Sequence, residues 1–207
     1  MPDVTTAYSA RAAEYIDLFG TTDAAHPDDL RCVVAWARSV TGRVLDAGCG
    51  PGQWTARLAS LGVDVRGIDV VSGFIDHARS TSPGVPFRLG SIDAIDEADA
   101  ALGGILSWFS TIHHDPARIH VPLAEFARTL RPGGGLLLGY FDSEAVEPFD
   151  HAVLQAFRRP ATVLRRMLAD AGFEVIETHR RATPGQRPVG AIVCRRDLGR
   201  AGVRPPG

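Results

Sequence analysis

The chain of 207 residues contains no lysine, so all 22 of its basic side chains are arginine. Cysteine is scarce, with three widely separated residues at Cys32, Cys49 and Cys194. This odd number and spacing exclude a disulfide framework and the common zinc-binding motifs, and they favour a reduced, cytoplasmic setting. No His/Asp/Glu cluster has coordination spacing either, and we therefore expect no metal site.

Long apolar runs are also missing. No segment approaches the ~18 consecutive apolar residues of a membrane-spanning helix, and residues 1–10 lack the basic and apolar regions of a signal peptide. The chain is 45% hydrophobic and 22% charged, which is typical of a folded globular protein. We therefore expect one domain, or a domain with a short appendage, and no membrane association.

Charge is distributed unevenly along the chain. The formal net charge of -2 argues against a strongly basic nucleic-acid binder. Residues 1–156 nevertheless hold 11 arginines against 20 acidic residues, whereas residues 157–207 hold 11 against 4. The late arginines come mostly as doublets without the interleaved aromatics that favour single-strand binding. We interpret them as a solvated face, with a nucleic-acid surface as the alternative.

Apolar segments alternate with amphipathic ones in an order typical of a parallel α/β sheet. The first five expected strands alternate with helices, and the last two are too close together for a crossover and should pair antiparallel. The pattern predicts a doubly wound, mostly parallel seven-stranded sheet whose last strand is antiparallel. The expected strands are 43–46, 63–69, 86–89, 101–108, 135–141, 173–179 and 189–195. The expected helices are 53–61, 72–79 (with Ser72 as N-cap), 123–130 and 161–171 (ending at Gly172).

The two ends of the chain lie outside this alternation. Helices are expected at 7–19 and 30–40, with a turn-rich stretch between them. We interpret residues 1–41 as an N-terminal helical cap over the open end of the sheet and residues 42–198 as the main domain. The tail, 199–207, has two prolines and three glycines, and we expect it to be disordered.

The turn after the first expected strand is the most informative segment. It has the pattern Asp-x-Gly-x-Gly-x-Gly, formed by Asp46, Gly48, Gly50 and Gly52. Glycines permit tight turns and close approach of a ligand, and amides at the start of the next helix can face a polar group. Dinucleotide-binding turns instead read Gly-x-Gly-x-x-Gly. A carboxylate this close would repel a diphosphate and suit a cationic or ammonium-bearing ligand.

A second carboxylate follows in the expected position for a nucleoside. The second strand ends in Asp69, seventeen residues beyond Gly52. A carboxylate at that edge can accept hydrogen bonds from both hydroxyls of a ribose.

With these landmarks, the chain resembles the class I S-adenosylmethionine-dependent methyltransferases over roughly residues 44–191. A helix containing Tyr8 and Tyr15 resembles the amino-terminal helix of the small-molecule members. The resemblance implies a Rossmann-like fold and methyl transfer from S-adenosylmethionine to a small organic acceptor. The matching segments are 46–52, 67–69, 90–93, 107–109, 130–134 and 171–173.

The resemblance also implies which residues bind the cofactor. The acid Asp46 would hold the amino group, and the glycines of the turn, Gly48, Gly50 and Gly52, would lie under the methionine and ribose portions. The acid Asp69 would bind the ribose diol.

Further implied contacts involve the two ends of the cofactor. Val70 and Ile92 would sandwich the adenine, and Asp93 would accept from its exocyclic amine. Ser107 would lie at the methionine end. Tyr8 and Tyr15 are seven residues apart and share a helix face, where they form either a lid over the cofactor or ordinary packing.

Two histidines follow the fourth strand and are candidates for a general base. His113 and His114 lie at the edge where ligands bind in open α/β sheets, and histidine titrates near neutrality. We favour His113 slightly. In the alternative, one histidine packs against the sheet and the other caps a helix starting at Asp115, and no dedicated base exists. The segment 141–160 should help to form the acceptor pocket, with Phe141 at its floor.

A small acceptor is favoured because no recognition domain is appended to the chain. The site after strand four also lacks the Asn/Asp-Pro-Pro-Tyr/Phe motif of enzymes that methylate amino groups of nucleic acids, and reads Ser-Trp-Phe-Ser at 107–110. Two alternatives stay open: an RNA methyltransferase that uses the arginine-rich third, and a cofactor-binding module without transfer activity.

Overall fold

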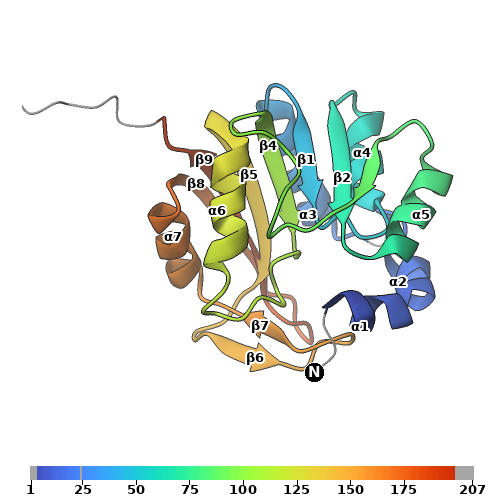
Figure 1. The fold of residues 1–207 in the computed structure, drawn as a ribbon. Coiled ribbons are helices and arrows are strands. Elements are labelled where there is room, and N and C mark those ends of the chain that lie inside the picture. Colours follow the sequence, from blue (N-terminus) through green and yellow to red (C-terminus); the bar gives the residue numbers. More distant parts are fainter. Residues whose placement is uncertain (1–3, 24, 199–207) are drawn as a thin grey trace, which may run out of the picture.

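The computed structural model describes residues 4–23 and 25–198; the tail expected to be disordered, 199–207, lies outside the described residues. Within them, a seven-stranded sheet has the order β3-β2-β1-β4-β5-β9-β8 (Figure 1). Strand β9 pairs antiparallel with both neighbours, while the first five strands pair in parallel, so the predicted fold class is confirmed. The strands are β1 (Val44–Ala47), β2 (Val65–Asp69), β3 (Phe87–Leu89), β4 (Leu102–Trp108), β5 (Leu130–Phe141), β8 (Phe173–Arg181) and β9 (Val189–Arg196).

Helices cover both faces of this sheet. The helices are α1 (Val4–Ala10), α2 (Ala12–Phe19), α3 (Pro27–Ser39), α4 (Gln53–Ser60), α5 (Ser72–Thr81), α6 (His120–Thr129) and α7 (Ala161–Asp170). One apolar cluster joins α3 and α4 to the sheet, and another joins α6 and α7 to it. None of the helices within the described part of the chain combines the length and apolar composition needed to cross a bilayer.

The sheet is buried on both faces, which explains its continuous apolar strands. Along β5, Leu136 and Leu138 pack with α6 and α7, while Leu137 between them packs with α3 and α4. All three side chains are fully buried. This alternation holds the carboxyl ends of the strands in fixed register, and the site lies at those ends.

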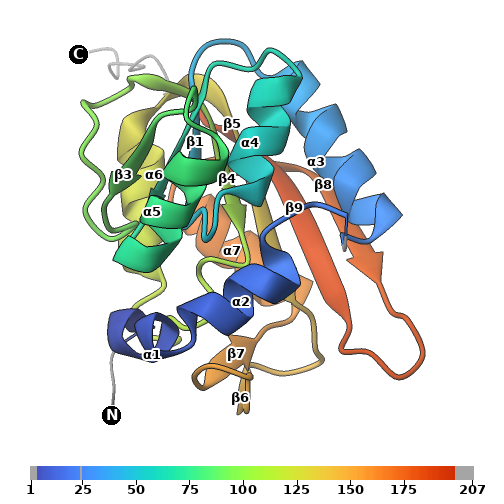
Figure 2. The ribbon, with the colours of Figure 1, turned by 90° about the vertical axis from the view of Figure 1, so that its right-hand side faces the viewer.

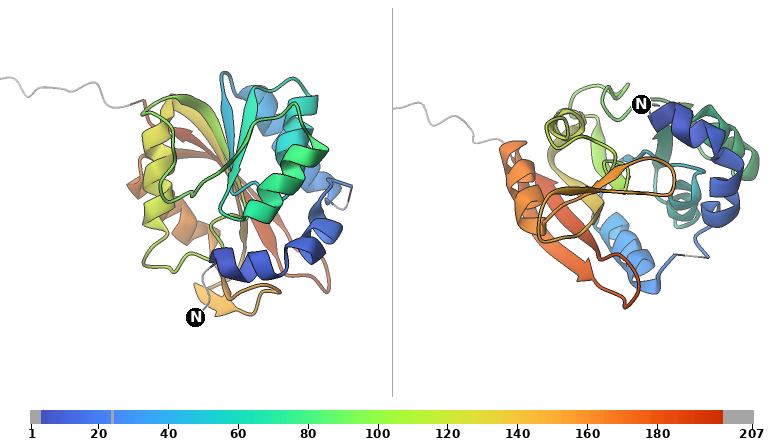
Figure 3. Two further views of the ribbon diagram at one scale, coloured as in Figure 1. Left: turned by 45° about the vertical axis from the view of Figure 1, so that its right-hand side comes forward. Right: turned by 90° about the horizontal axis from the view of Figure 1, so that it is seen from below.

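The amino-terminal helices differ from the expectation. The predicted helix over 7–19 is broken at Arg11, whose φ of -121° and ψ of 16° are not helical. After the break, α2 lies beside α5 (Figure 2). The ring centroids of Tyr15 on α2 and Phe74 on α5 are 5.2 Å apart. Helix α3 begins at Pro27 and packs on a face of the sheet. Of the described helices before β1, α1 and α2 are the ones at the carboxyl end of the sheet (Figure 3).

One expected N-cap and one alternative helix start are wrong. Helix α5 begins at Ser72 as predicted, but its N-cap is Val71, whose amide donates to the carboxylate of Asp69. No helix starts at Asp115: α6 begins at His120, and Asp115 accepts from the amide of Ala117 in a turn.

A small hairpin was not expected. Strands β6 (Glu147–Phe149) and β7 (Ala156–Arg158) pair antiparallel in a sheet of their own. Seen from the carboxyl end of the sheet, the hairpin and helices α1 and α2 lie over the strand ends (Figure 3). The segment 141–160, predicted to help form the pocket, therefore contains regular structure.

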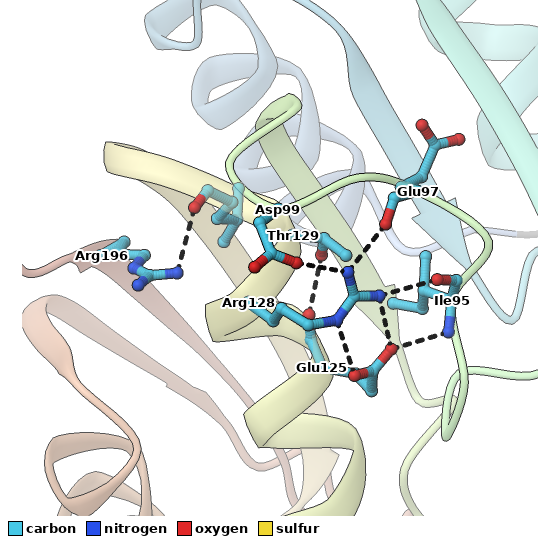
Figure 4. A network of polar contacts seen from close by, with 8 residues as sticks. Ile95, Glu97, Asp99, Glu125, Arg128, Thr129 and Arg196 are labelled. Atoms are coloured by element: carbon cyan, nitrogen blue, oxygen red, sulfur yellow. Dashed lines mark hydrogen bonds and ion pairs between the residues drawn. The ribbon is translucent and has the colours of Figure 1, made fainter.

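A polar network holds the loop that follows β3. The guanidinium of Arg128 on α6 donates to the carbonyl oxygens of Ile95 and Glu97, each at 2.8 Å, and to the carboxylates of Asp99 and Glu125 (Figure 4). Glu125 in turn accepts from the Ile95 amide at 2.8 Å. The loop is thereby fixed against α6, which positions the preceding residues 92 and 93.

Candidate active site at the carboxyl ends of the strands

A cavity of about 960 Å³ opens at the carboxyl ends of β1, β2 and β4, under helices α1 and α2. It is lined by all the predicted site residues except Gly52 and Ser107. The predicted residues at its wall are Tyr8, Tyr15, Asp46, Gly48, Gly50, Asp69, Val70, Ile92, Asp93, His113 and His114.

The amides of the glycine turn are used inside the protein. Those of Gly48 and Cys49 both donate to the Ile68 carbonyl at 2.9 Å, and that of Gly52 donates to the Cys49 carbonyl at 3.1 Å. The Gly50 amide donates to the carboxylate of Asp69 at 2.9 Å. These four amides are therefore already bonded within the protein, and residues 48–52 offer no amide cradle to a diphosphate.

Gly48 is a position where a side chain cannot fit. Its φ of +78° is strained for other residues, and an added Cβ would lie 2.4 Å from the Cβ of Ser110. Gly50 also has a positive φ, and an added Cβ there would lie 3.9 Å from the ring of Tyr15. The turn thus lets a ligand approach the backbone between β1 and the tyrosine.

Asp46 is a buried carboxylate at the tip of β1, with 1% of its surface exposed. The hydroxyl of Thr55 donates to its Oδ2 at 2.6 Å. Burial, with a smaller contribution from the charge of Asp69, raises the pKa of Asp46 to about 7, although the hydrogen bond from Thr55 opposes the shift. Among the described residues, no basic side chain forms an ion pair with Asp46.

Asp69 ends β2 beside it. Burial raises its pKa, although hydrogen bonds from the backbone amides of Val71 and Gly50, both at 2.9 Å, oppose the shift. Like Asp46, it has no ion-pair partner in the described part of the chain. Two carboxylates from adjacent parallel strands therefore face one cavity without a cation.

The two predicted site residues outside the cavity wall have packing contacts. Gly52 has a φ of +90°, and a Cβ there would lie 2.7 Å from Ala78 and 2.9 Å from the ring of Phe87. Ser107 is fully buried, and its hydroxyl lies 2.8 Å from that of Ser110. Ser110, which follows the end of β4, lines the cavity where Ser107 was predicted to do so.

The far end of the cavity combines apolar and ionisable groups. Val70 and Ile92 both line it. Asp93 lies next to them, and its Oδ1 is 2.8 Å from Nε2 of His114. His114 therefore contacts the residue predicted to meet the adenine amine.

His113 is held from both sides of its ring. Nδ1 lies 2.9 Å from the carbonyl oxygen of Gln155, and Nε2 lies 2.9 Å from the hydroxyl of Tyr8. A carbonyl only accepts, so Nδ1 carries the proton and Nε2 accepts from Tyr8. Burial lowers the pKa of His113, which favours the neutral ring.

The turn that carries the histidines is bonded to the hairpin. The amide of Phe157 donates to the Ile112 carbonyl at 2.8 Å. The guanidinium of Arg159, with 2% of the residue exposed, donates to the His114 carbonyl. Both histidines can line the cavity because they lie in this irregular turn rather than in a helix or strand.

The two tyrosines are packed against each other over the cavity. Their ring centroids lie 5.4 Å apart, and both rings contact Phe74 of α5. Burial raises the pKa of each hydroxyl, to about 12 for Tyr15. The structure thus combines lining of the cavity with ordinary packing, the two roles considered for this pair.

Sequence reasoning missed other lining residues. Phe109 has a φ of +59°, which is rare for a residue with a large side chain, and it lines the cavity with Gln53 and Ser110. The carbonyl oxygen of the Gln53 side chain is buried and has no hydrogen-bond partner among the described residues. Only the position just after the glycine turn could have indicated Gln53. No sequence pattern indicates the backbone conformation of Phe109.

Comparison with known proteins identifies similar sequences and a matching family model. A family model described as a methyltransferase domain matches residues 44–134. A probable S-adenosylmethionine-dependent methyltransferase from Mycolicibacterium smegmatis is 32% identical over 140 residues, which cover 65% of this chain and 53% of the relative. The first curated relatives are spanned by this chain over 37 to 53% of their length.

Solved structures share the fold. The 1,6-didemethyltoxoflavin-N1-methyltransferase of Burkholderia thailandensis, solved with 1,6-didemethyltoxoflavin and S-adenosylhomocysteine, has a TM-score of 0.73 at 19% identity. That match covers 95% of this chain and 92% of the other. The cyclase SpnF has a TM-score of 0.77 at 18% identity, covering 95% and 96%.

Proposed function

Because this chain belongs to the class I S-adenosylmethionine-dependent methyltransferases, we propose that it transfers a methyl group from S-adenosylmethionine to a small organic acceptor. The bound cofactor would supply a methyl group already activated by the positive charge of its sulfonium. The protein would therefore contribute mainly alignment of the acceptor and, for a protonated nucleophile, removal of a proton.

One observation supports this proposal above the others: the paired carboxylates Asp46 and Asp69 face the cavity without a cation. A ligand with an ammonium and a sulfonium group matches this charge. A diphosphate does not, since the amides of the glycine turn are already used. In this assignment Asp46 holds the amino group and Asp69 the ribose hydroxyls.

We assign the remaining predicted residues in the same way. Gly48 and Gly50 leave room under the methionine and ribose, and Val70 and Ile92 enclose the adenine. Asp93, oriented by His114, accepts from the adenine amine. Tyr8 and Tyr15 close the methionine end, while Gly52 and Ser107 act through the packing of the turn and of Ser110.

His113 is our candidate for the general base. Its Nε2 carries a lone pair at the cavity wall, and its tautomer is fixed by the Gln155 carbonyl. An acceptor hydroxyl or amine that displaces the hydroxyl of Tyr8 would deliver its proton to this atom. His114 is less suited, because its Nε2 is already bound to Asp93.

Calorimetry with S-adenosylhomocysteine tests the cofactor assignment. We expect one molecule bound per chain and a loss of about 1.5–3 kcal/mol in Asp69→Ala, the range for a hydrogen bond to a charged group. Asp76→Ala is the matched control, because that exposed carboxylate lies on α5 away from the cavity. Unchanged affinity in Asp69→Ala would contradict the role of Asp69 in binding the ribose hydroxyls. If the wild type does not bind S-adenosylhomocysteine, the proposed function is wrong.

A screen of small acceptors, read as release of S-adenosylhomocysteine, tests transfer itself. Binding of the cofactor without turnover on any acceptor would favour a non-catalytic module. Retention on RNA at low salt that falls steeply as salt rises would favour the RNA alternative.

A further inference from the structure

The part of the cavity that the cofactor residues leave open is walled by aromatic rings. The centroids of Phe109 and Phe141 lie 5.0 Å apart, and Trp108 lies 5.4 Å from Phe109. The ring centroid of His151 lies 6.2 Å from that of Phe141 and 5.3 Å from that of His113. Burial lowers the pKa of His151 to about 4, so this ring is neutral near pH 7. The wall therefore suits a flat apolar ring.

The conformation of Phe109 supports a role for this wall in binding. A positive φ at a large side chain costs free energy, and such residues cluster at functional sites. Phe109 directly follows β4, and its amide donates to the Gly139 carbonyl at 3.2 Å. The strained backbone places the ring at the cavity wall, in contact with Phe141, instead of continuing the strand.

A second hollow of about 760 Å³ adjoins this wall and shares Phe141, Arg181 and Gln186 with the main cavity. Three arginines line it, Arg158, Arg181 and Arg187, and no acidic residue is among its described lining residues. The ionisable side chains of this lining are basic, whereas Asp46 and Asp69 at the other end of the main cavity are acidic.

These three arginines differ in their partners. Arg158 pairs with Glu147 at 3.0 Å, and Arg181 pairs with Asp29 at 2.7 Å. Arg187 has no carboxylate partner within the described ranges. Its guanidinium carbon lies 4.8 Å from the centroid of the Phe149 ring, and it donates to the Asp150 carbonyl at 3.3 Å.

We propose that the acceptor is a flat aromatic molecule with a carboxylate, its ring against Phe109 and Phe141 and its carboxylate on Arg187. The proposal rests on the proposed function. The subsite for the ring and the subsite for the carboxylate adjoin each other. The Phe149 ring connects them, because its centroid lies 4.8 Å from the Arg187 guanidinium carbon and 5.0 Å from the centroid of the Phe141 ring. An acceptor placed in this way would keep its nucleophile on the side of His113.

Calorimetry with two matched pairs of compounds tests this inference. The pairs are 3-hydroxy-2-naphthoate with 3-hydroxy-2-naphthamide, and 4-hydroxybenzoate with 4-hydroxybenzamide. Each is titrated into the full chain with and without saturating S-adenosylhomocysteine. The variant is Arg187→Gln, whose exposed side chain makes loss of folding unexpected, and the control is Arg166→Gln on the exposed side of α7.

We expect at least one acid to bind about tenfold or more tightly than its amide, the effect of one hydrogen bond between charged groups. Arg187→Gln should abolish this preference, and Arg166→Gln should retain it. Phe109→Ala should weaken the acid and the amide alike, because both place a ring there.

Three results would each overturn the inference: equal affinity of acid and amide, a preference that survives in Arg187→Gln, or no binding of any of the four compounds. The cofactor assignment is judged separately by the heat of S-adenosylhomocysteine binding. If that heat is absent, the titrations of the cofactor-free protein still decide whether the ring and carboxylate subsites exist.

Discussion

The hydroxyl of Tyr8 donates a hydrogen bond to Nε2 of His113, 2.9 Å away and 105 residues further along the chain. The opposite ring nitrogen of His113 donates to the Gln155 carbonyl. Together these two contacts fix which nitrogen is basic and cover it with the first helix. An acceptor must therefore replace Tyr8 at this atom before it can lose a proton to it.

Replacement of His113 by glutamine should lower kcat by a factor of about 10² to 10⁴, the usual contribution of a general base. Affinity for S-adenosylhomocysteine should change little, because the proposed cofactor contacts remain. His120→Gln, at the exposed start of α6, is the matched control and should keep full activity. If His113→Gln retains wild-type kcat, the enzyme works without this base.

The dependence of kcat on pH should reflect the neutral state of His113. Because burial lowers its pKa below 6.5, the base stays unprotonated above pH 7 and gains a proton only in more acidic solution. At saturating cofactor and acceptor, we expect kcat to be constant from pH 7 upward and to fall below pH 6.5. A kcat that rises between pH 7 and 9 would assign the controlling ionisation to another group.

Asp46 should couple cofactor affinity to pH. With its pKa near 7, this carboxylate is increasingly protonated as the pH falls below 7, and the neutral form attracts a cation less. The dissociation constant for S-adenosylmethionine should therefore rise up to about tenfold per pH unit below 7. Asp46→Asn should bind weakly at every pH, and a variant whose pH profile matches the wild type would exclude this coupling.

The same substitution should raise stability. The folded pKa of Asp46 is above its unfolded value, so ionisation destabilises the folded state increasingly as the pH rises from about 4 through 7. Asparagine removes that charge and can still accept from Thr55. We expect Asp46→Asn to melt at a higher temperature than the wild type at pH 8 and to lose this advantage at pH 4.

Two Gly→Ala substitutions should distinguish the effect of backbone strain from the effect of a steric clash. Gly48 and Gly62 have similar φ values, +78° and +82°. An added Cβ would lie 2.4 Å from Ser110 at Gly48, but at Gly62 it would meet no described residue within 4 Å. Both Gly→Ala changes should cost about 1 kcal/mol of backbone strain. Only Gly48→Ala should also abolish binding of S-adenosylhomocysteine, measured by calorimetry. Equal binding by both variants would contradict the claim that position 48 has no space for a side chain.

The positions of the strands along the chain could be predicted because buried strands leave a clear apolar signal, as at residues 136–138. The acids at the ends of β1 and β2 could be placed for the same reason. The directions of the strands followed from the helices between them and from the short last connection. The hairpin β6–β7 was missed, since its three-residue strands are half exposed and carry no alternating pattern. The break at Arg11 and the strained Phe109 depend on packing between segments that are far apart in the sequence.

The two strands of the hairpin form a sheet of their own, and backbone hydrogen bonds tie the hairpin to Ile112 and to Phe141 at the end of β5. Side-chain mutations on it would therefore reshape the acceptor side while leaving the pairing within the seven-stranded sheet in place. A change of acceptor can therefore arise from substitutions in this one segment. We expect relatives to differ most in residues 141–160 and least in the turn after β1.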